Sequence, residues 1–356
     1  MSPGRCPGGG SYDDAGEGVR AYRRAGVDVE AGAEAVALIR DIARSASRPE
    51  VATGVGGFAG LFRLDDRRLL AAATDGVGTK LEIARLAGRL DTVGIDLVAM
   101  CANDVVCTGA RPLLFLDYLA VERVVPEEVA SIVTGVAEGC RRAGCALLGG
   151  ETAEHPGVLS DGRFDLAGFC VGVVDQDRVL DPGSVRAGDV LLGFRSSGLH
   201  SNGYSLVRRA LVEDAASLRA QVPALGRTLG EELLEPTTMY VESLLALSQD
   251  GLARSAAHIT GGGFVENIPR ALPPDLGAAI DVQAWEPQPI FGMVADAAGL
   301  ERTDLLSVLN MGIGMVVVVP RSRADDAVVR TKGLVDASVI GEVVAEPGVT
   351  FGSRRN

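Results

Sequence analysis

Residues 94–106 read GIDLVAMCANDVV, and this stretch decides the fold expected for the first half of the chain. Apolar residues recur at helical spacing over residues 91–108, which predicts a helix. Asp96, Asn103 and Asp104 are seven and eight positions apart, so one face of that otherwise apolar helix carries all three side chains. Buried polar oxygens cost free energy unless they are satisfied. Metal ligation would satisfy them, and internal hydrogen bonds or caps are the alternative.

Strands and helices alternate on both sides of this segment, with glycine-rich loops between them. This pattern predicts an α/β protein. Strands are expected at 69–74, 113–119, 145–148, 165–174, 190–194, 256–260, 313–319 and 338–344, and helices at 29–48, 126–143, 204–212 and from residue 264 onward.

The length of 356 residues exceeds that of one ordinary hydrophobic core, so two domains are expected. The turn-rich run 175–189 is the candidate linker. We therefore expect a flexible leader over 1–21, an N-terminal domain over 22–175 and a C-terminal domain over 176–356.

The net charge of −13 argues against general attraction to nucleic acid or to anionic lipid. The six cysteines form no CxxC pair and no regular framework, which indicates a reduced cytosol. No segment has the pattern of a signal peptide or reaches the length of a membrane span. We expect a cytoplasmic protein that contacts neither membrane nor nucleic acid.

Two glycine-rich segments in the first half suit a phosphorylated ligand. The loop 54–60, GVGGFAG, can bring backbone N–H groups close to an anion, although a plain turn is the alternative. The segment 75–80, DGVGTK, offers Asp75 to a metal ion and Lys80 to phosphate, and its alternative is a capped strand-to-helix turn with a solvated lysine.

Three further loops carry candidate side chains. Glu151, in the expected loop 149–152, could complete a carboxylate cluster with Asp75 and Asp104, and a surface turn is the alternative. The loop 196–203, SSGLHSNG, lies between a strand and a helix, where backbone amides hold phosphates, and His200 in it could carry a proton or be structural. Packing explains His258, just before the glycines 261–263, equally well, and the three histidines lack zinc spacing.

Eight strings occur in the order seen in the phosphoribosylformylglycinamidine cyclo-ligase family, also called aminoimidazole ribonucleotide synthetase, and the chain resembles that family from about Tyr22 to Val344. The strings are GVGGFAG, ATDGVGTKL, GIDLVAMCANDVV, LLGGETAEHPG, AGFCVGVV, SSGLHSNGYSLVR, HITGGGFVENIPR and NMGIGMVVVV. Any one of them is a modest signal, but eight in order over most of the chain are specific.

The resemblance implies an N-terminal ferredoxin-like sheet domain that dimerises into a β-barrel, and a C-terminal αβ domain that covers the substrate site. It implies a homodimer that uses ATP and Mg²⁺ to close an imidazole ring in purine biosynthesis. The implied roles are as follows: Asp75, Asp104 and Glu151 bind Mg²⁺; Asp96 supports them; Gly56, Gly57, Phe58, Gly60, Gly76, Thr79, Lys80 and Asn103 contact ATP; Ser197, His200, Ser201, Asn202, Gly261 and Gly262 face the substrate; and His200, Lys80 and Asp104 are catalytic.

The chain departs from the family pattern at Thr238, where a basic residue is common, at 307–309, where Arg-Thr-Phe is usual, and at Arg111, where an acid is frequent. These changes put substrate contacts or dimer packing in doubt rather than phosphoryl transfer. Rival interpretations are the other ATP-using enzymes of the superfamily, which include thiamine-monophosphate kinase, and a nucleotide-binding paralogue without turnover. A dinucleotide-dependent dehydrogenase is disfavoured because no GxGxxG opens a helix after the first strand.

Overall fold

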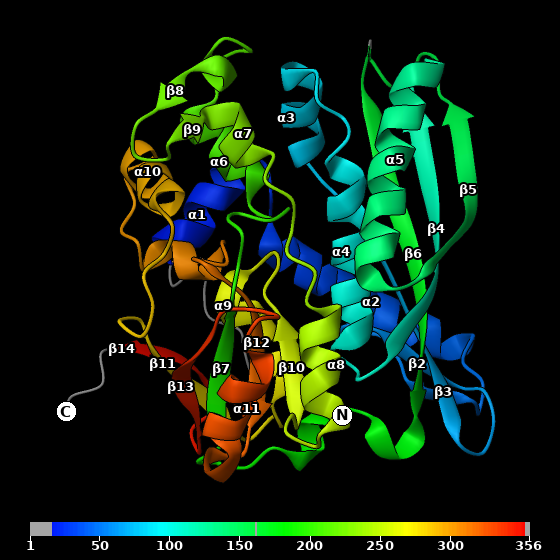
Figure 1. Cartoon of the computed structure of the whole chain (residues 1–356), viewed down its shortest axis with the longest axis vertical. Helices are drawn as coiled ribbons and strands as arrows, with labels where there is room; N and C mark the ends of the chain where they lie inside the picture. The colour runs from blue at the N-terminus through cyan, green and yellow to red at the C-terminus, as the bar shows by residue number, and fades with distance from the viewer. Residues whose placement is uncertain (1–15, 161, 353–356) are drawn as a thin grey trace, which may run out of the picture.

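Two six-stranded sheets lie side by side in the structure, a computed structural model that describes residues 16–160 and 162–352 (Figure 1). The N-terminal sheet has the order β1-β2-β3-β6-β4-β5, and the C-terminal sheet has the order β10-β12-β7-β13-β11-β14. This arrangement confirms the expected fold of two α/β sheet domains. Short 3₁₀ turns at Gln176–Arg178 and Pro182–Ser184 connect the two sheets.

The N-terminal sheet is covered on one face by α4 and α5. The glycine at position 94 lets these helices meet backbone to backbone, because a Cβ there would lie 2.2 Å from the backbone nitrogen of Val136. The elements of this half are α1 (Glu17–Arg24), α2 (Val29–Ser45), β1 (Val51–Thr53), β2 (Gly60–Arg63), β3 (Arg68–Gly76), α3 (Lys80–Ala87), α4 (Val93–Val106), β4 (Arg111–Val121), α5 (Pro126–Ala143), β5 (Ala146–Glu154) and β6 (Phe164–Asp175).

The other face of this sheet is open in the single chain. Leu116 on β4 is paired with Phe169 on β6, and Tyr118 lies two residues further along the same strand. These side chains are 37%, 40% and 42% exposed, respectively. Successive residues of a strand point to opposite faces, so the three apolar side chains share the face that no helix covers. The described strands form an open sheet rather than a closed barrel.

The C-terminal sheet is built on two apolar central strands, β7 and β12, in which every residue except Arg195 is buried. The elements of this half are β7 (Val190–Arg195), α6 (Tyr204–Leu211), β8 (Gln221–Val222), β9 (Arg227–Thr228), α7 (Leu229–Leu233), α8 (Val241–Gln249), β10 (Ser255–His258), α9 (Gly263–Asn267), η4 (Ile268–Ala271), β11 (Gly277–Asp281), α10 (Pro289–Ala298), η5 (Asp304–Ser307), β12 (Ile313–Val319), α11 (Ala324–Thr331), β13 (Ala337–Val344) and β14 (Gly348–Gly352).

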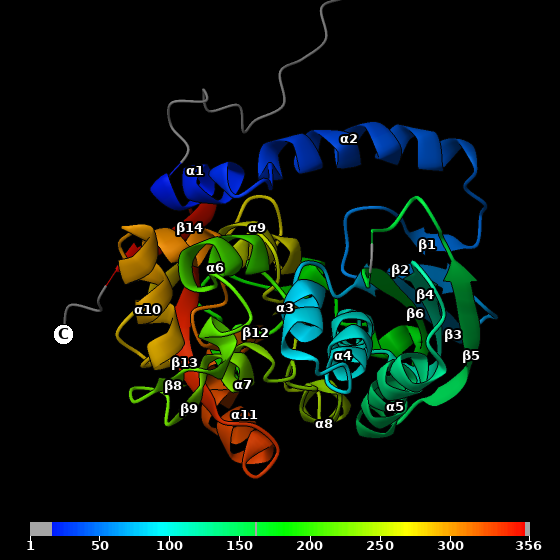
Figure 2. The same ribbon diagram turned by 90° about the horizontal axis from the view of Figure 1, so that it is seen from above.

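The beginning of the described chain packs on the C-terminal half. In Figure 2, α1 lies beside α6, and α2 runs from there to β1 at the edge of the N-terminal sheet. Tyr22 is buried, and a Cβ at Gly18 would lie 2.0 Å from the carbonyl oxygen of Asp304. The expectation of a flexible leader is therefore wrong for residues 17–21, and residues 1–15 lie outside the described part of the chain.

Two further expectations are corrected by the strand assignments. The stretch 149–152, expected to be a loop, continues β5, because Gly149 to Thr152 pair with residues 116–119 of β4. The strand 338–344, expected to be the last, is followed by β14, which pairs with β11 in parallel. No helix in the described part of the chain is long and apolar enough to cross a membrane.

Candidate active site at the end of strand β3

Two carboxylates from different elements approach each other beneath the C-terminal domain. Asp75 stands at the end of β3, and Asp104 lies in the last turn of α4. Burial, together with the negative charge of Asp104, raises the pKa of Asp75 to about 6. A cation placed between the two carboxylates would remove this repulsion. The pair therefore fits a hard divalent cation such as Mg²⁺, which is typically held by one or two carboxylates together with water and phosphate oxygens.

His258 orients the second carboxylate. Its Nδ1 lies 2.9 Å from Oδ1 of Asp104, and its side chain is fully buried at the end of β10. Because a carboxylate accepts, Nδ1 carries the proton, and the buried Nε2 has no hydrogen-bond partner among the described residues. The sequence left packing and a polar role equally open for His258, and the contact with Asp104 decides for the polar role.

Glu151 does not join the two aspartates within one chain. Asp75 pairs with Gly168 on β6, Gly168 pairs with Asp117 on β4, and Asp117 pairs with Gly150 on β5. Three strand spacings of about 4.8 Å place Glu151 roughly 14 Å from Asp75. The expectation of a cluster of three carboxylates is therefore wrong for the isolated chain.

The direction of the Glu151 side chain leads to the same conclusion. Glu151 is paired with Tyr118, so the two side chains lie on the open face of the sheet, whereas Asp75 faces α4. Among residues 16–160 and 162–352, no group of three or more His, Cys, Asp or Glu side chains is arranged to hold a metal ion. Of the three expected carboxylates, the described part of the chain brings Asp75 and Asp104 together, and their binding of a metal ion stays a prediction.

Lys80 on α3 and Asp96 on α4 form a buried ion pair, and this pair lies at the interface with the C-terminal domain. The Nζ of Lys80 lies 2.8 Å from the Asp96 carboxylate and donates to the carbonyl oxygens of His200 and Glu235. Asp96 also accepts from the backbone N–H and the hydroxyl of Thr237. All three donors of the ammonium group are used, so this geometry gives Lys80 a structural role, and its contact with phosphate stays a prediction.

The loop 196–203 is hydrogen-bonded to the segment 236–240. The ring of His200 is 1% exposed, and its Nε2 lies 3.4 Å and 3.3 Å from the backbone nitrogens of Ser197 and Thr238. Burial lowers the pKa of His200 well below its usual value, so the ring is neutral at pH 7. His200 has a backbone φ of 61°, which is uncommon outside glycine and indicates local strain.

The remaining candidates in this region also make internal contacts. The hydroxyl of Ser197 donates to Pro236, and that of Ser201 lies 3.2 Å from the hydroxyl of Thr237. Asn103, expected to contact ATP, is buried and bridges the carbonyl of Thr238 and the N–H of Tyr240. The structure brings these residues together at the domain interface but turns their side chains inward. Their ligand contacts stay predictions.

Two glycine loops, one from each domain, carry further expected ligand contacts. In the first, Gly56 and Gly57 are exposed and Phe58 is half-buried, while Gly60 already belongs to β2. In the second, Gly261 is exposed and its N–H donates to Oδ1 of Asn202 at 3.0 Å, and Gly262 adopts a φ of 85° that favours glycine.

Two other expected ATP contacts lie between the end of β3 and the start of α3. Gly76 is the last residue of β3, and Thr79 precedes α3 and is exposed, with its hydroxyl 3.2 Å from that of Ser205. Arg270, which sequence reasoning missed, reaches the first glycine loop from the C-terminal domain. Contact between the backbone N–H groups of these loops and an anionic ligand stays a prediction.

Comparison with known proteins identifies the family. Residues 56–174 match the model of the AIR synthase related protein, N-terminal domain, and residues 186–353 match that of the C-terminal domain. A phosphoribosylformylglycinamidine cyclo-ligase of Acetivibrio thermocellus is 51% identical over 91% of this chain and 97% of its own length. One of Geotalea uraniireducens is 49% identical over 90% of this chain and 94% of its own length.

The chain belongs to the phosphoribosylformylglycinamidine cyclo-ligase family. This confirms the family and the class of ATP-dependent ligase expected from the sequence. Among solved structures, T. maritima PurL complexed with ADP has a TM-score of 0.57 and 22% identity, over 86% of this chain and 45% of that one. That likeness concerns the fold alone.

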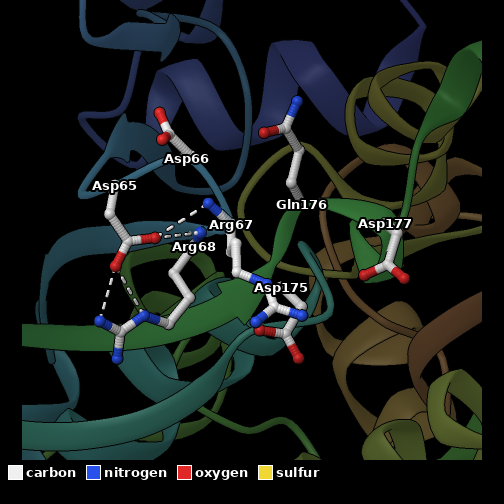
Figure 3. Close-up of a pocket in the computed structure, with 7 residues that line it drawn as sticks. All are labelled: Asp65, Asp66, Arg67, Arg68, Asp175, Gln176 and Asp177. Atoms are coloured by element: carbon white, nitrogen blue, oxygen red, sulfur yellow. Dashed lines mark hydrogen bonds and ion pairs between the residues drawn. The ribbon is translucent and has the colours of Figure 1, made fainter.

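One surface hollow of the chain lies far from this site. A hollow of about 1030 Å³ lies at the opposite end of β3, where Arg68 forms an ion pair with Asp65 (Figure 3). Seven residues at about 3.3 Å each separate Arg68 from Asp75, roughly 23 Å. The lining residues lie at or next to the ends of β3 and β6: Asp65, Asp66, Arg67, Arg68, Asp175, Gln176 and Asp177. This hollow therefore takes no part in our assignment of the active site.

Replacing Lys80 tests its structural role. Lys80→Met leaves Asp96 buried without its cation, so we expect a loss of about 3–5 kcal/mol in the free energy of unfolding. Lys332→Met, at an exposed position, is the matched control, with a change of less than about 0.5 kcal/mol. Urea unfolding followed by circular dichroism measures both variants. Equal stability of the two variants would show that the buried pair is not needed.

The raised pKa of Asp75 predicts a pH-dependent effect on stability. Its folded-state value of about 6 exceeds the ordinary 3.8, so the folded chain binds this proton more tightly than the unfolded chain. The contribution of Asp75 to stability is therefore lost as the pH rises from about 4 to about 6.

Removing that charge should consequently stabilise the metal-free protein only at higher pH. We expect Asp75→Asn to add about 1–2 kcal/mol at pH 7.5 and almost nothing at pH 4.5. Urea unfolding in EDTA at both pH values measures the difference, with Asp66→Asn, at an exposed position, as the control. A gain that is the same at both pH values would show that the folded structure does not raise the pKa of Asp75.

Proposed function

We propose that this chain uses ATP to convert formylglycinamidine ribonucleotide into aminoimidazole ribonucleotide, with release of ADP and phosphate, in purine biosynthesis. Membership of the cyclo-ligase family supports this reaction. The observation that carries it in the structure is the acidic pair of Asp75 and Asp104, together with Arg270, which acts electrostatically on Asp75 and contacts the glycine loop 54–60.

The reaction consists of two steps. The formamide oxygen attacks the γ-phosphorus of ATP, the bond to the β-phosphate oxygen breaks, and ADP leaves. The amidine nitrogen then attacks the activated carbon, the carbon–oxygen bond breaks, and phosphate and a proton are lost. An amide oxygen is a poor leaving group, and its phosphorylation turns it into a good one.

The chain's own residues have separate tasks in this scheme. Asp75 and Asp104 would hold Mg²⁺, with His258 fixing the direction of Asp104. When bound, Mg²⁺ supplies charge neutralisation on the phosphates. The backbone N–H groups of loop 54–60 would contact the phosphates. His200 remains our candidate for handling the proton released on ring closure, and it must become accessible when the loop 196–203 moves.

We further propose that the protein is a homodimer joined through the open face of the N-terminal sheet. An exposed face with Leu116, Tyr118 and Phe169 in adjacent positions is a typical subunit interface. A two-fold interface would bury this face and bring the Glu151 of one chain towards the site of the other. We also propose a cytoplasmic location, since ATP and the phosphorylated intermediates of purine synthesis are found there.

The test is incubation of the purified protein with formylglycinamidine ribonucleotide and Mg²⁺-ATP. We expect ADP and a diazotisable aminoimidazole to form in equal amounts. ADP without aminoimidazole would reject the substrate and favour another ATP-using reaction of the superfamily. Neither product, with nucleotide shown to bind, would favour a paralogue without turnover.

A further inference from the structure

We propose that Arg270 is a positioning residue that clamps the glycine loop 54–60 against the C-terminal domain and so prepares it for ATP. This inference rests on the proposed function only in naming ATP as the ligand. The clamp itself is a contact between two domains, and it can be tested without any nucleotide.

Arg270 contacts the loop in two independent ways. From η4 in the C-terminal domain, its Nη2 donates to the carbonyl oxygen of Gly57 at 2.8 Å. Its Cζ lies 3.8 Å from the centroid of the Phe58 ring, which is the distance of a cation–π contact. A planar guanidinium can stack and donate at the same time, whereas a lysine ammonium lacks the flat face.

The other side of the guanidinium is anchored. Nη1 of Arg270 donates to Oδ1 of Asn267 at 3.0 Å. The Nδ2 of Asn267 donates to the carbonyls of Gly261 and Gly263 at 3.0 Å and 2.8 Å, and the N–H of Gly261 donates to Asn202. A continuous chain of hydrogen bonds therefore joins loop 54–60 to the two loops expected to face the substrate.

Arg270 also places its charge beside the acidic pair. Its positive field lowers the pKa of Asp75, opposing the larger effects of burial and of Asp104. The same side chain thus lies within electrostatic reach of the metal site and in contact with the phosphate loop.

The glycine content of the loop explains why a clamp would strengthen nucleotide binding. Four of the seven residues in 54–60 are glycine, so the free loop has many conformations, and ordering it at each binding event would cost conformational entropy. A loop that is already held in a binding-competent conformation avoids that cost. Removing the clamp should therefore lower the fraction of molecules in which the loop has that conformation, and nucleotide binding should weaken as a result.

The experiment uses the full-length protein, three test variants and one control variant. Hydrogen exchange of a peptide covering 54–60 is measured without ligand, and the Kd of the non-hydrolysable Mg²⁺-AMPPNP is measured by calorimetry. Arg270→Met removes both contacts, Arg270→Lys keeps the charge, and Phe58→Leu keeps Arg270 but removes the stacking. Arg330→Met, on α11 and paired with Asp250, is the control.

We expect loop exchange in Arg270→Met to be about tenfold faster and the Kd about tenfold weaker, since affinity falls with the competent fraction of the loop. Phe58→Leu and Arg270→Lys should fall in between, and Arg330→Met should match the wild type. Unchanged exchange in both Arg270→Met and Phe58→Leu would overturn the clamp. If the wild type fails to bind AMPPNP, the proposed function falls, while exchange without ligand still decides the clamp.

Discussion

A hybrid dimer made of two inactive chains should be active. We expect Asp104→Asn and Glu151→Gln each to lower ATP turnover at least about a thousandfold, because a loss of about 4 kcal/mol of charge stabilisation has that effect on a rate. In one chain, Glu151 lies on the open sheet face and three strands away from Asp75. If both carboxylates serve one site, they must come from different chains.

Co-expression with two affinity tags isolates the hybrid of the two variants. One of its two sites then carries both substitutions and the other carries neither, so about half of the wild-type activity should return. The control is a hybrid of Asp104→Asn with Asp75→Asn, which leaves no intact pair and should stay inactive. An inactive first hybrid, with both variants folded and dimeric, would contradict the assignment across chains. Near-normal activity of Glu151→Gln alone would contradict the assignment of Glu151 to the metal site.

The regular elements of the fold could be predicted because their burial follows a simple period. The expected helix 126–143 matches α5, and the expected strand 313–319 matches β12. The residues 149–152 were missed as a strand because two glycines lower strand propensity, and only pairing with β4 imposes the extended conformation. Such pairing joins residues distant in the sequence, which a local pattern does not contain.

The candidate site was predictable in its residue types but not in its contacts. The sequence suggested Asp75 and Asp104 as members of one carboxylate cluster, and the resemblance to the family implied that both bind Mg²⁺. It did not indicate that Lys80 would be buried against Asp96, or that Arg270 would cross from the other domain. The first contact depends on how α3 packs on α4 and the second on how the two domains meet, so no spacing within one segment could have shown them.

Replacing His200 should separate ring closure from ATP binding. We expect His200→Ala to slow formation of aminoimidazole by about 10²–10⁴-fold, the usual effect of losing a general acid or base, while the Kd of AMPPNP changes less than about threefold. Single-turnover assays and calorimetry measure the two quantities. Burial keeps the imidazole neutral at pH 7, so it would act as a proton acceptor once the loop 196–203 opens.

A structural role for His200 would give a different pattern. The ring accepts from the N–H groups of Ser197 and Thr238, so its removal takes an acceptor from both and leaves a cavity, although the Ser197 N–H keeps the hydroxyl of Thr238. His200→Gln offers a side-chain oxygen to these donors but no group that takes a proton near pH 7. Recovery of ring closure in His200→Gln would show that His200 only supports the loop. A stable but equally slow His200→Gln would leave proton transfer as the step that needs the imidazole.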